Sequence, residues 1–209
     1  MAQHTDRPAT ERPAALLGLA AEALRCASAA ALGTTSGAAV DDAVIAAERA
    51  LQPLRDAVEQ DAAALLARSA PEPAGTLALL ARVHLGADVQ QLGELARRIT
   101  ETAAARGTRG PLPADLRRPL ETMAALGLAM LATAARSLPD PRSDHLADLH
   151  GDRTEMARHQ SVLYARLLDA DPPPARADTV DAVLLSGHYD GCAHHALSAA
   201  RHAALFAGR

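Results

Sequence analysis

Alanine dominates this sequence, and aromatic residues are almost absent from it. Of its 209 residues 52 are Ala, whereas there are two Tyr, one Phe and no Trp. Alanine has the best intrinsic helix propensity, while β-sandwiches and barrels depend on aromatic and β-branched side chains. The sequence therefore predicts an all-α fold and excludes an all-β fold.

Proline and glycine divide the chain into six segments with a helical pattern of apolar residues. The breaks fall at residues 33–37, 71–73, 107–113, 138–141 and 171–174. The predicted helices cover residues 11–32, 40–69, 74–106, 113–137, 143–170 and 178–208. Because short connections join long amphipathic helices, we expect sequential helices to lie antiparallel in a bundle.

The third and sixth predicted helices match each other at a shift of 100 residues. Their apolar stripes are Leu85, Val89, Leu92, Ala96 and Ile99 in one helix and Leu185, Tyr189, Cys192, Ala196 and Ala199 in the other. The match predicts two pseudo-symmetric three-helix bundles, formed by residues 1–110 and 111–209. Because Ala-rich helices also match one another by chance, six unrelated helices stay open as the alternative.

Charge and cysteine content restrict the partners and the compartment. The net charge is −4 with no block of like charges, which argues against nucleic acid or an anionic membrane as the main partner. The two cysteines, Cys26 and Cys192, form no CxxC motif and fit a reducing compartment. The apolar stretch Pro13–Ala21 is followed by Glu22 and Arg25, so it is a poor signal peptide or membrane span. We expect a cytoplasmic protein that does not insert into a membrane.

Two polar pairs lie beside the matched stripes at equivalent positions: Gln90 with Glu94, and Asp190 with His194. Residues four apart are neighbours on a helix surface, so both side chains of a pair can reach one point. Two such pairs on facing helices would offer carboxylate, imidazole and amide ligands to a metal ion. The alternative is an ordinary solvated helix face on which nearby arginines pair with the acids.

A weaker metal candidate is the acidic stripe of the fifth predicted helix, where Asp148 and Asp152 are four residues apart. Glu48 on the second predicted helix is a further candidate ligand of the same kind. An acidic stripe on a helix is also what a solvated surface requires, and that alternative stays open for all three residues.

Catalytic templates are absent from the sequence. It contains no GxxxxGK[ST] phosphate loop, no Lys to complete one, and no GxSxG elbow. Cys192 lies on the apolar stripe and fits a buried hydrophobe rather than a nucleophile, and His195 and His202 are interpreted as surface histidines. We therefore expect that the protein is not an enzyme. A metal-dependent helical-bundle enzyme and a plain helical interaction module remain alternatives.

Three stretches resemble the PhoU family of phosphate-uptake regulators. Residues 87–96 read ADVQQLGELA and are similar to the family signature, roughly Ala-Asp-Leu-Glu-Arg-Ile-Gly-Asp-His-Ala. Residues 184–196, LLSGHYDGCAHHA, stand where the second signature is expected. Residues 65–75 resemble the family's Leu-Leu-Ala-Leu-x-x-Pro-Val-Ala-Gly turn with one extra residue. Helix order and total length agree, so the resemblance covers about residues 13–208.

The resemblance implies a pair of three-helix bundles and a regulatory role. Family members are cytoplasmic adaptors that repress the phosphate-starvation response between the phosphate ABC transporter and a sensor histidine kinase. They commonly dimerise, and they bind multinuclear metal clusters through acidic pairs on the signature helices. For this chain the resemblance implies the transporter ATPase, the kinase and a second copy of itself as partners.

The sequence departs from the family at the implied metal site. The two acidic pairs have become Gln90 with Glu94 and Asp190 with His194, which leaves two carboxylates, one imidazole and one amide. A multinuclear cluster needs many negative charges to offset the repulsion between its cations. We therefore expect a degenerate site that holds a single Fe, Zn, Mn or Mg ion, or no metal.

Overall fold

The computed structural model describes three long stretches of the chain and a few positions between the first two. The described residues are 7–33, 73–138, 143–206, Arg49, Gln52, Pro53, Asp56, Glu59, Gln60 and Ala63. Most of the second predicted helix, residues 40–69, lies outside them, although the seven described positions in that range are helical. The candidate ligand Glu48 also lies outside the described residues.

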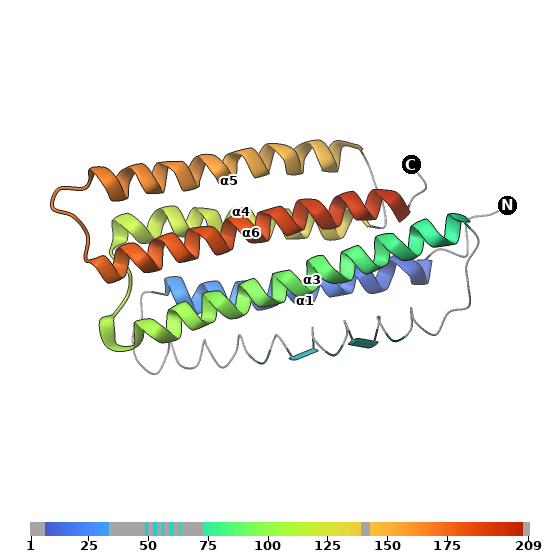
Figure 1. The fold of residues 1–209 in the computed structure, drawn as a ribbon, viewed down its shortest axis with the longest axis horizontal. Coiled ribbons are helices and arrows are strands. Elements are labelled where there is room, and N and C mark those ends of the chain that lie inside the picture. Colours follow the sequence, from blue (N-terminus) through green and yellow to red (C-terminus); the bar gives the residue numbers. More distant parts are fainter. Residues whose placement is uncertain are drawn as a thin grey trace.

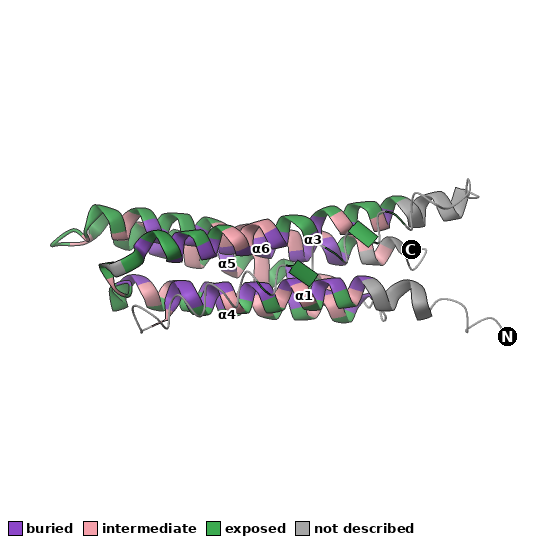
Figure 2. Cartoon of the chain, turned by 90° about the horizontal axis from the view of Figure 1, so that it is seen from below, coloured by how far each residue is buried: buried purple, intermediate pink, exposed green. Residues whose placement is uncertain are grey.

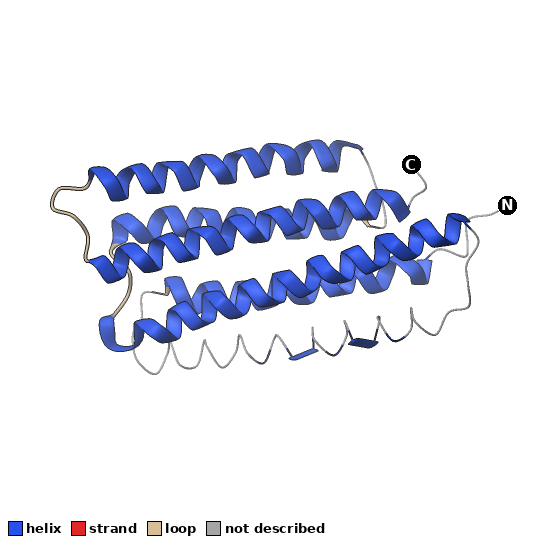
Figure 3. Ribbon diagram, viewed as in Figure 1, coloured by secondary structure: helices blue, strands red, loops and turns tan. Residues whose placement is uncertain are grey.

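The described part of the chain contains five α-helices and no strand (Figures 1 and 3). They are α1 (Arg7–Leu32), α3 (Pro73–Arg106), α4 (Ala114–Ser137), α5 (Ser143–Asp169) and α6 (Arg176–Phe206), with a short 3₁₀ helix, η1 (Gly107–Arg109). The predicted all-α class is confirmed. Because the range 40–69 is only sparsely described, the predicted total of six helices in two bundles is not confirmed.

Four of these helices form the centre of the bundle. Helices α1 and α4 pack on each other, α3 packs on α1 and α6, and α6 packs on α4, while α5 lies against both α4 and α6. Figure 2 shows the buried residues concentrated between the layer of α1 and α4 and the layer of α3 and α6. A Cβ on Gly127 of α4 would lie 3.9–4.0 Å from Leu24 of α1, Met156 of α5 and Cys192 of α6, so four helices meet at this point.

Helices α3 and α6 run antiparallel along each other, as Figure 1 shows. Every residue of the two predicted apolar stripes is at most 1% exposed, which confirms both stripes as core. The 100-residue match also extends to the outer side of the helices, because Val83 and Val183 are both exposed. Equivalent positions on α3 and α6 therefore share burial as well as residue type.

A buried arginine holds the end of α3 to the start of α6. Arg106 is only 7% exposed, and its Nη1 donates to Asp178 at 2.9 Å and to Asp181 at 2.8 Å. Its Nε donates to the carbonyl oxygen of Gly110 at 2.9 Å. Gly107 and Gly110 have positive φ angles of 51° and 80°, a region that glycine adopts without steric cost. The connection between the two predicted repeats is thus fixed by a glycine turn and a buried ion pair.

One stretch of the described chain, Pro13–Leu32 of α1, is long and apolar enough to cross a membrane by length and composition alone. Its mean hydropathy is 1.5, and 61% of it is buried inside the protein. Core helices of soluble proteins pass the same test. Since Leu17 and Leu24 are at most 1% exposed within the bundle core, we describe α1 as a core helix.

Candidate functional site

The first predicted ligand pair lies on α3, where the acidic member is already paired. Gln90 is exposed, and the side chain of Glu94 is 33% exposed. Arg97 donates to Glu94 through Nη2 at 2.6 Å and Nε at 3.0 Å, and Nε of Arg98 donates at 3.0 Å. The hydrogen bonds from Arg97 and then from Arg98 lower the pKa of Glu94 to about 2. Glu94 is therefore ionised and neutralised by its own helix.

The second predicted pair lies on α6, and its carboxylate is paired across helices. Arg153 of α5 donates from Nη1 to Asp190 Oδ1 at 2.7 Å and from Nη2 to Oδ2 at 2.9 Å. Both side chains are about a quarter exposed, at 28% for Arg153 and 24% for Asp190. His194 is exposed, and its ring meets the ring of His195 edge-on with centroids 5.2 Å apart.

This donor set does not fit a metal ion as the side chains lie here. Both carboxylates, Glu94 and Asp190, already accept charge-assisted hydrogen bonds from arginine. No group of three or more His, Cys, Asp or Glu side chains able to hold a metal occurs among the described residues. A bound metal would require Arg97, Arg98 and Arg153 to move away, and the metal site stays a prediction.

The weaker candidates on α5 are placed on the outer part of the bundle. Asp148 is exposed and Asp152 is half-buried. Burial and, to a smaller extent, the charge of Asp148 raise the pKa of Asp152. Two carboxylates that repel each other and have no third ligand in the described chain provide no preformed metal site.

A buried carboxylate between α3 and α6 forms a polar cluster that sequence analysis missed. Asp88 is 7% exposed, and its two carboxylate oxygens lie 2.9 Å from Nδ1 of His195 and 2.9 Å from Nδ1 of His202. The ring of His84 stacks on that of His202, with centroids 5.0 Å apart. The two histidines thus satisfy a carboxylate whose burial without partners would be costly.

The signal for this cluster was present but depended on the packing of two helices. His195 and His202 are seven residues apart, which places them on the same side of α6. Their partner Asp88 lies more than 100 residues away on α3. The interpretation of both histidines as surface residues is corrected, because the antiparallel register of α3 and α6 places them against Asp88, with side chains only 24% and 22% exposed.

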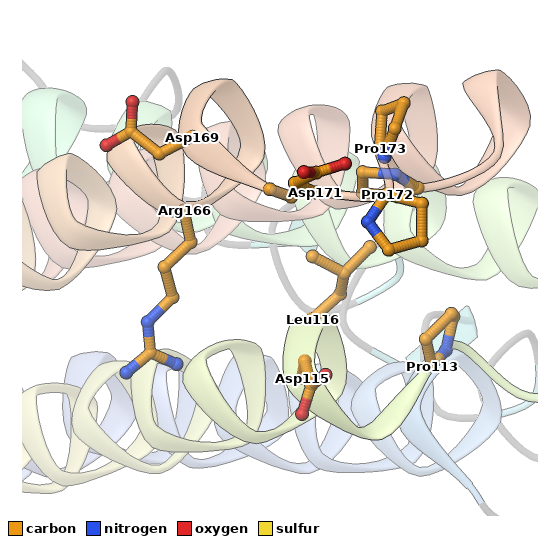
Figure 4. Close-up of a pocket in the computed structure, with 10 residues that line it drawn as sticks. Pro113, Asp115, Leu116, Arg166, Asp169, Asp171, Pro172 and Pro173 are labelled. Atoms are coloured by element: carbon orange, nitrogen blue, oxygen red, sulfur yellow. The ribbon is translucent and has the colours of Figure 1, made fainter.

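A cleft of about 790 Å³ lies where α4 begins and the connection from α5 to α6 passes over it (Figure 4). Its lining includes Asp115 and Leu116 of α4, Arg166 and Asp169 of α5, and the prolines of the range 172–174. Figure 4 shows Arg166 extending from α5 toward α4, while Leu116 extends from α4 toward the proline-rich connection. The cleft is thus walled by proline rings and has a mixed charge at its rim.

No family model matches the chain, but individual proteins do. Over 192 residues the chain is 25% identical to the "Phosphate-specific transport system accessory protein PhoU homolog 2" of Mycobacterium bovis and to that of Mycobacterium tuberculosis. Each match covers 92% of this chain and 89% of the relative.

Two solved structures share the fold over nearly their whole length. The crystal structure of PhoU from Pseudomonas aeruginosa superimposes with a TM-score of 0.79 at 14% identity, covering 95% of both chains. The phosphate transport system regulatory protein PhoU from Streptococcus pneumoniae superimposes with a TM-score of 0.71 at 16% identity, covering 98% of this chain and 97% of that one. The sequence match to the mycobacterial proteins and the fold shared with the two PhoU structures support the assignment of this chain as a divergent PhoU-family member.

Proposed function

We propose that this chain is a non-enzymatic accessory protein of phosphate transport. In this role it binds the ATPase of a phosphate ABC transporter and a sensor histidine kinase in the cytoplasm, and it represses the phosphate-starvation response while phosphate is plentiful. The observation that carries the proposal is the match to a phosphate-specific transport accessory protein over 92% of the chain. The similarity spans the whole bundle rather than one motif, which supports a shared mode of action.

The mechanism of such a regulator is binding, and the helix surfaces offer apolar contact area for it. Leu80 and Val83 of α3 are about half exposed, as is Val180 of α6, and Val183 and Leu184 beside it are exposed as well. Because α3 and α6 are antiparallel, these residues form two groups at opposite ends of the helix pair. Exposed apolar residues that lie together on a surface are typical of protein interaction sites. Any signal that passes through the protein must come from a difference in its affinity for two states of the partner.

Two finer parts of the proposal have separate tests. A homodimer stays a prediction, which light scattering coupled to size-exclusion chromatography tests. The metal site that the sequence predicts at Gln90, Glu94, Asp190 and His194 is a separate prediction, which the arginine partners of Glu94 and Asp190 oppose. Elemental analysis of the purified chain tests it.

Capture of the partners from the native host tests the proposal. The tagged full-length chain is expressed at native level, and its partners are identified after growth in high and in low phosphate. We expect enrichment of the transporter ATPase and the sensor kinase over a tagged helical bundle of similar size. Enrichment of neither protein in both growth conditions would contradict the proposal.

A pair of surface variants sharpens this experiment. Charging the exposed apolar side of α6, with Val183→Glu and Leu184→Glu together, is expected to reduce capture of the ATPase. Val162→Glu on α5 is the matched control, because Val162 is also an exposed apolar residue (38%) on the outside of the bundle. Circular dichroism checks that both variants keep the helical content of the parent chain. Equal capture by the two variants would mean that this side of α6 does not bind the ATPase.

A further inference from the structure

Asp190 is a carboxylate that needs a cation. Asp190 lies on α6 next to Tyr189, which is completely buried. Only about a quarter of the Asp190 side chain is exposed. A carboxylate removed from water to this extent is costly unless it is paired and hydrogen-bonded. The other predicted ligands are the amide Gln90, the imidazole His194 and the carboxylate Glu94, and none of them carries a permanent positive charge. Within that set, only an added cation would balance the charge of Asp190.

The chain supplies this cation from another helix. Arg153 comes from α5, 37 residues before Asp190, and both of its terminal nitrogens donate to the two oxygens of the carboxylate. Such a bidentate fork satisfies charge and geometry together, which the ammonium group of Lys does not do. Arg97 and Arg98 of α3 likewise donate hydrogen bonds to the carboxylate of Glu94 on their own helix.

We propose that Arg153 is a built-in cation that takes the place of a metal ion at Asp190, and that it ties α5 to α6 without metal. A divalent ion bound to the oxygens of Asp190 would lie close to the guanidinium group and repel it. It would also leave Arg153, which is largely buried, without its partner. The proposal goes beyond the regulatory role and stands whether or not the chain controls phosphate uptake.

Removing the built-in cation and offering an external one tests the proposal. Thermal unfolding of the full chain is measured in EDTA and in excess Mn²⁺ for the wild type, Arg153→Ala, Asp190→Asn and the double variant. Arg158→Ala is the matched control, because Arg158 lies on α5 but pairs with Glu155 of the same helix in an exposed position.

In EDTA we expect Arg153→Ala to lower Tm by roughly 3–8 °C, and Arg158→Ala to lower it by less than about 2 °C. We expect the loss in Arg153→Ala to shrink when Asp190→Asn is added, because the uncompensated carboxylate is then gone. Mn²⁺ should raise the Tm of Arg153→Ala, because ligand binding to the native state stabilises it. Mn²⁺ should leave the Tm of the wild type and of the double variant unchanged.

Three results would overturn the proposal. The first is a wild-type Tm that rises with Mn²⁺ in a manner that Asp190→Asn abolishes, which would mean that metal binds despite Arg153. The second is equal stability of Arg153→Ala and Arg158→Ala. The third is a destabilised Arg153→Ala variant that Mn²⁺ does not stabilise, which would leave Arg153 as a structural partner that does not occupy a cation site.

Discussion

Arginine is the only residue type in this sequence whose side chain carries a permanent positive charge. The sequence contains 21 Arg and no Lys, and Glu94 on α3, Glu155 on α5 and Asp190 on α6 each pair with arginine. Arginine recognises a carboxylate with two parallel hydrogen bonds and keeps its charge at every physiological pH. Charge balance at Glu94, whose pKa is lowered to about 2, is therefore insensitive to pH near neutrality.

The lowered pKa of Glu94 predicts an acid dependence of stability. Its pKa in the folded chain is about 2, below its ordinary value of 4.5, because Arg97 and Arg98 hydrogen-bond to the ionised form. The contribution to stability is therefore present above pH 4.5 and is lost as the pH falls toward 2. Replacing Glu94 with Gln should destabilise the chain at pH 6, and the difference from the wild type should vanish near pH 2. Urea unfolding of both proteins across this range measures it.

A difference between the two proteins that stays constant from pH 6 to pH 2 would contradict the Glu94 prediction. Glu121→Gln on α4 is the control. Glu121 accepts one hydrogen bond from Arg117 at 3.1 Å rather than several. Replacing Glu121 should therefore produce a smaller change in the free energy of unfolding at pH 6.

The two cysteines should differ in reactivity. Cys192 is completely buried, and burial raises the pKa of its thiol to about 12. Cys26 is partly exposed, although burial raises the pKa of its thiol as well. Because the thiolate is the reactive form, iodoacetamide should modify Cys26 slowly and Cys192 only after unfolding. Mass spectrometry of native and urea-unfolded samples measures this, and equal native labelling of both thiols would contradict it.

At the level of the helices, a close contact between α3 and α6 is made possible by a glycine. A Cβ added to Gly191 of α6 would lie 3.0 Å from Cδ1 and 3.2 Å from Cδ2 of Leu95 on α3. Gly187, one turn earlier on the same helix, is exposed, and nothing lies within 4 Å of its Cβ position. Substitutions at the two glycines therefore separate the effect of helix propensity on stability from the effect of packing between α3 and α6.

Replacing these two glycines with alanine should change the stability of the chain differently. Gly187→Ala should stabilise the chain by about 0.5–1 kcal/mol, because Ala favours the helix over Gly. Gly191→Ala should lose that gain or become destabilising, because Leu95 must shift. Urea unfolding of both variants measures the difference, and equal stabilisation by the two substitutions would contradict the close contact of α3 and α6.

The shared burial of α3 and α6 predicts equal effects at equivalent positions. Leu85→Ala and Leu185→Ala each remove a completely buried side chain, at a cost of about 2–5 kcal/mol. Val83→Ala and Val183→Ala alter exposed positions and should change the free energy of unfolding by no more than about 0.5 kcal/mol. If Val83→Ala or Val183→Ala lowered the free energy of unfolding as much as Leu85→Ala or Leu185→Ala does, the faces of α3 and α6 assigned to the core would be wrong.

Sequence reasoning located the five described helices because their ends are set by local chemistry. The third predicted helix began at residue 74 and α3 begins at Pro73, since proline fits the first turn of a helix and residues 107–113 break the pattern. The apolar stripes were also predicted correctly, because the helical period alone decides which residues share a face. These features depend on neighbours only a few residues apart.

The pairing of polar groups between helices could not be predicted in this way. The Arg153–Asp190 pair and the cluster of Asp88 with His195 and His202 depend on the rotation and axial offset of packed helices. A shift of one helix by a single turn would exchange these partners for others. Sequence analysis therefore named Asp190 as a candidate metal ligand but did not identify Arg153 as its partner.

At the level of the whole molecule, the helix contacts have the order expected of two repeats. Helix α1 packs on α3 as α4 packs on α6, and the two pairs meet through the contacts of α1 with α4 and of α3 with α6. We propose on this basis that residues 1–110 and 111–209 are the two repeats. The long interface between α3 and α6 is tied by Arg106 with Asp178 and Asp181 toward one end and by the Asp88 cluster toward the other.

The measurement that tests the account most directly is calorimetric binding of the purified full-length chain to the phosphate transporter ATPase of its own host, first in EDTA and then in Mn²⁺. We predict saturable binding of equal affinity in both buffers, since we propose that the chain binds this partner through its helix surfaces and that Arg153 supplies the cation at Asp190. Binding in neither buffer would contradict the regulatory function, and binding that requires Mn²⁺ would contradict the role of Arg153.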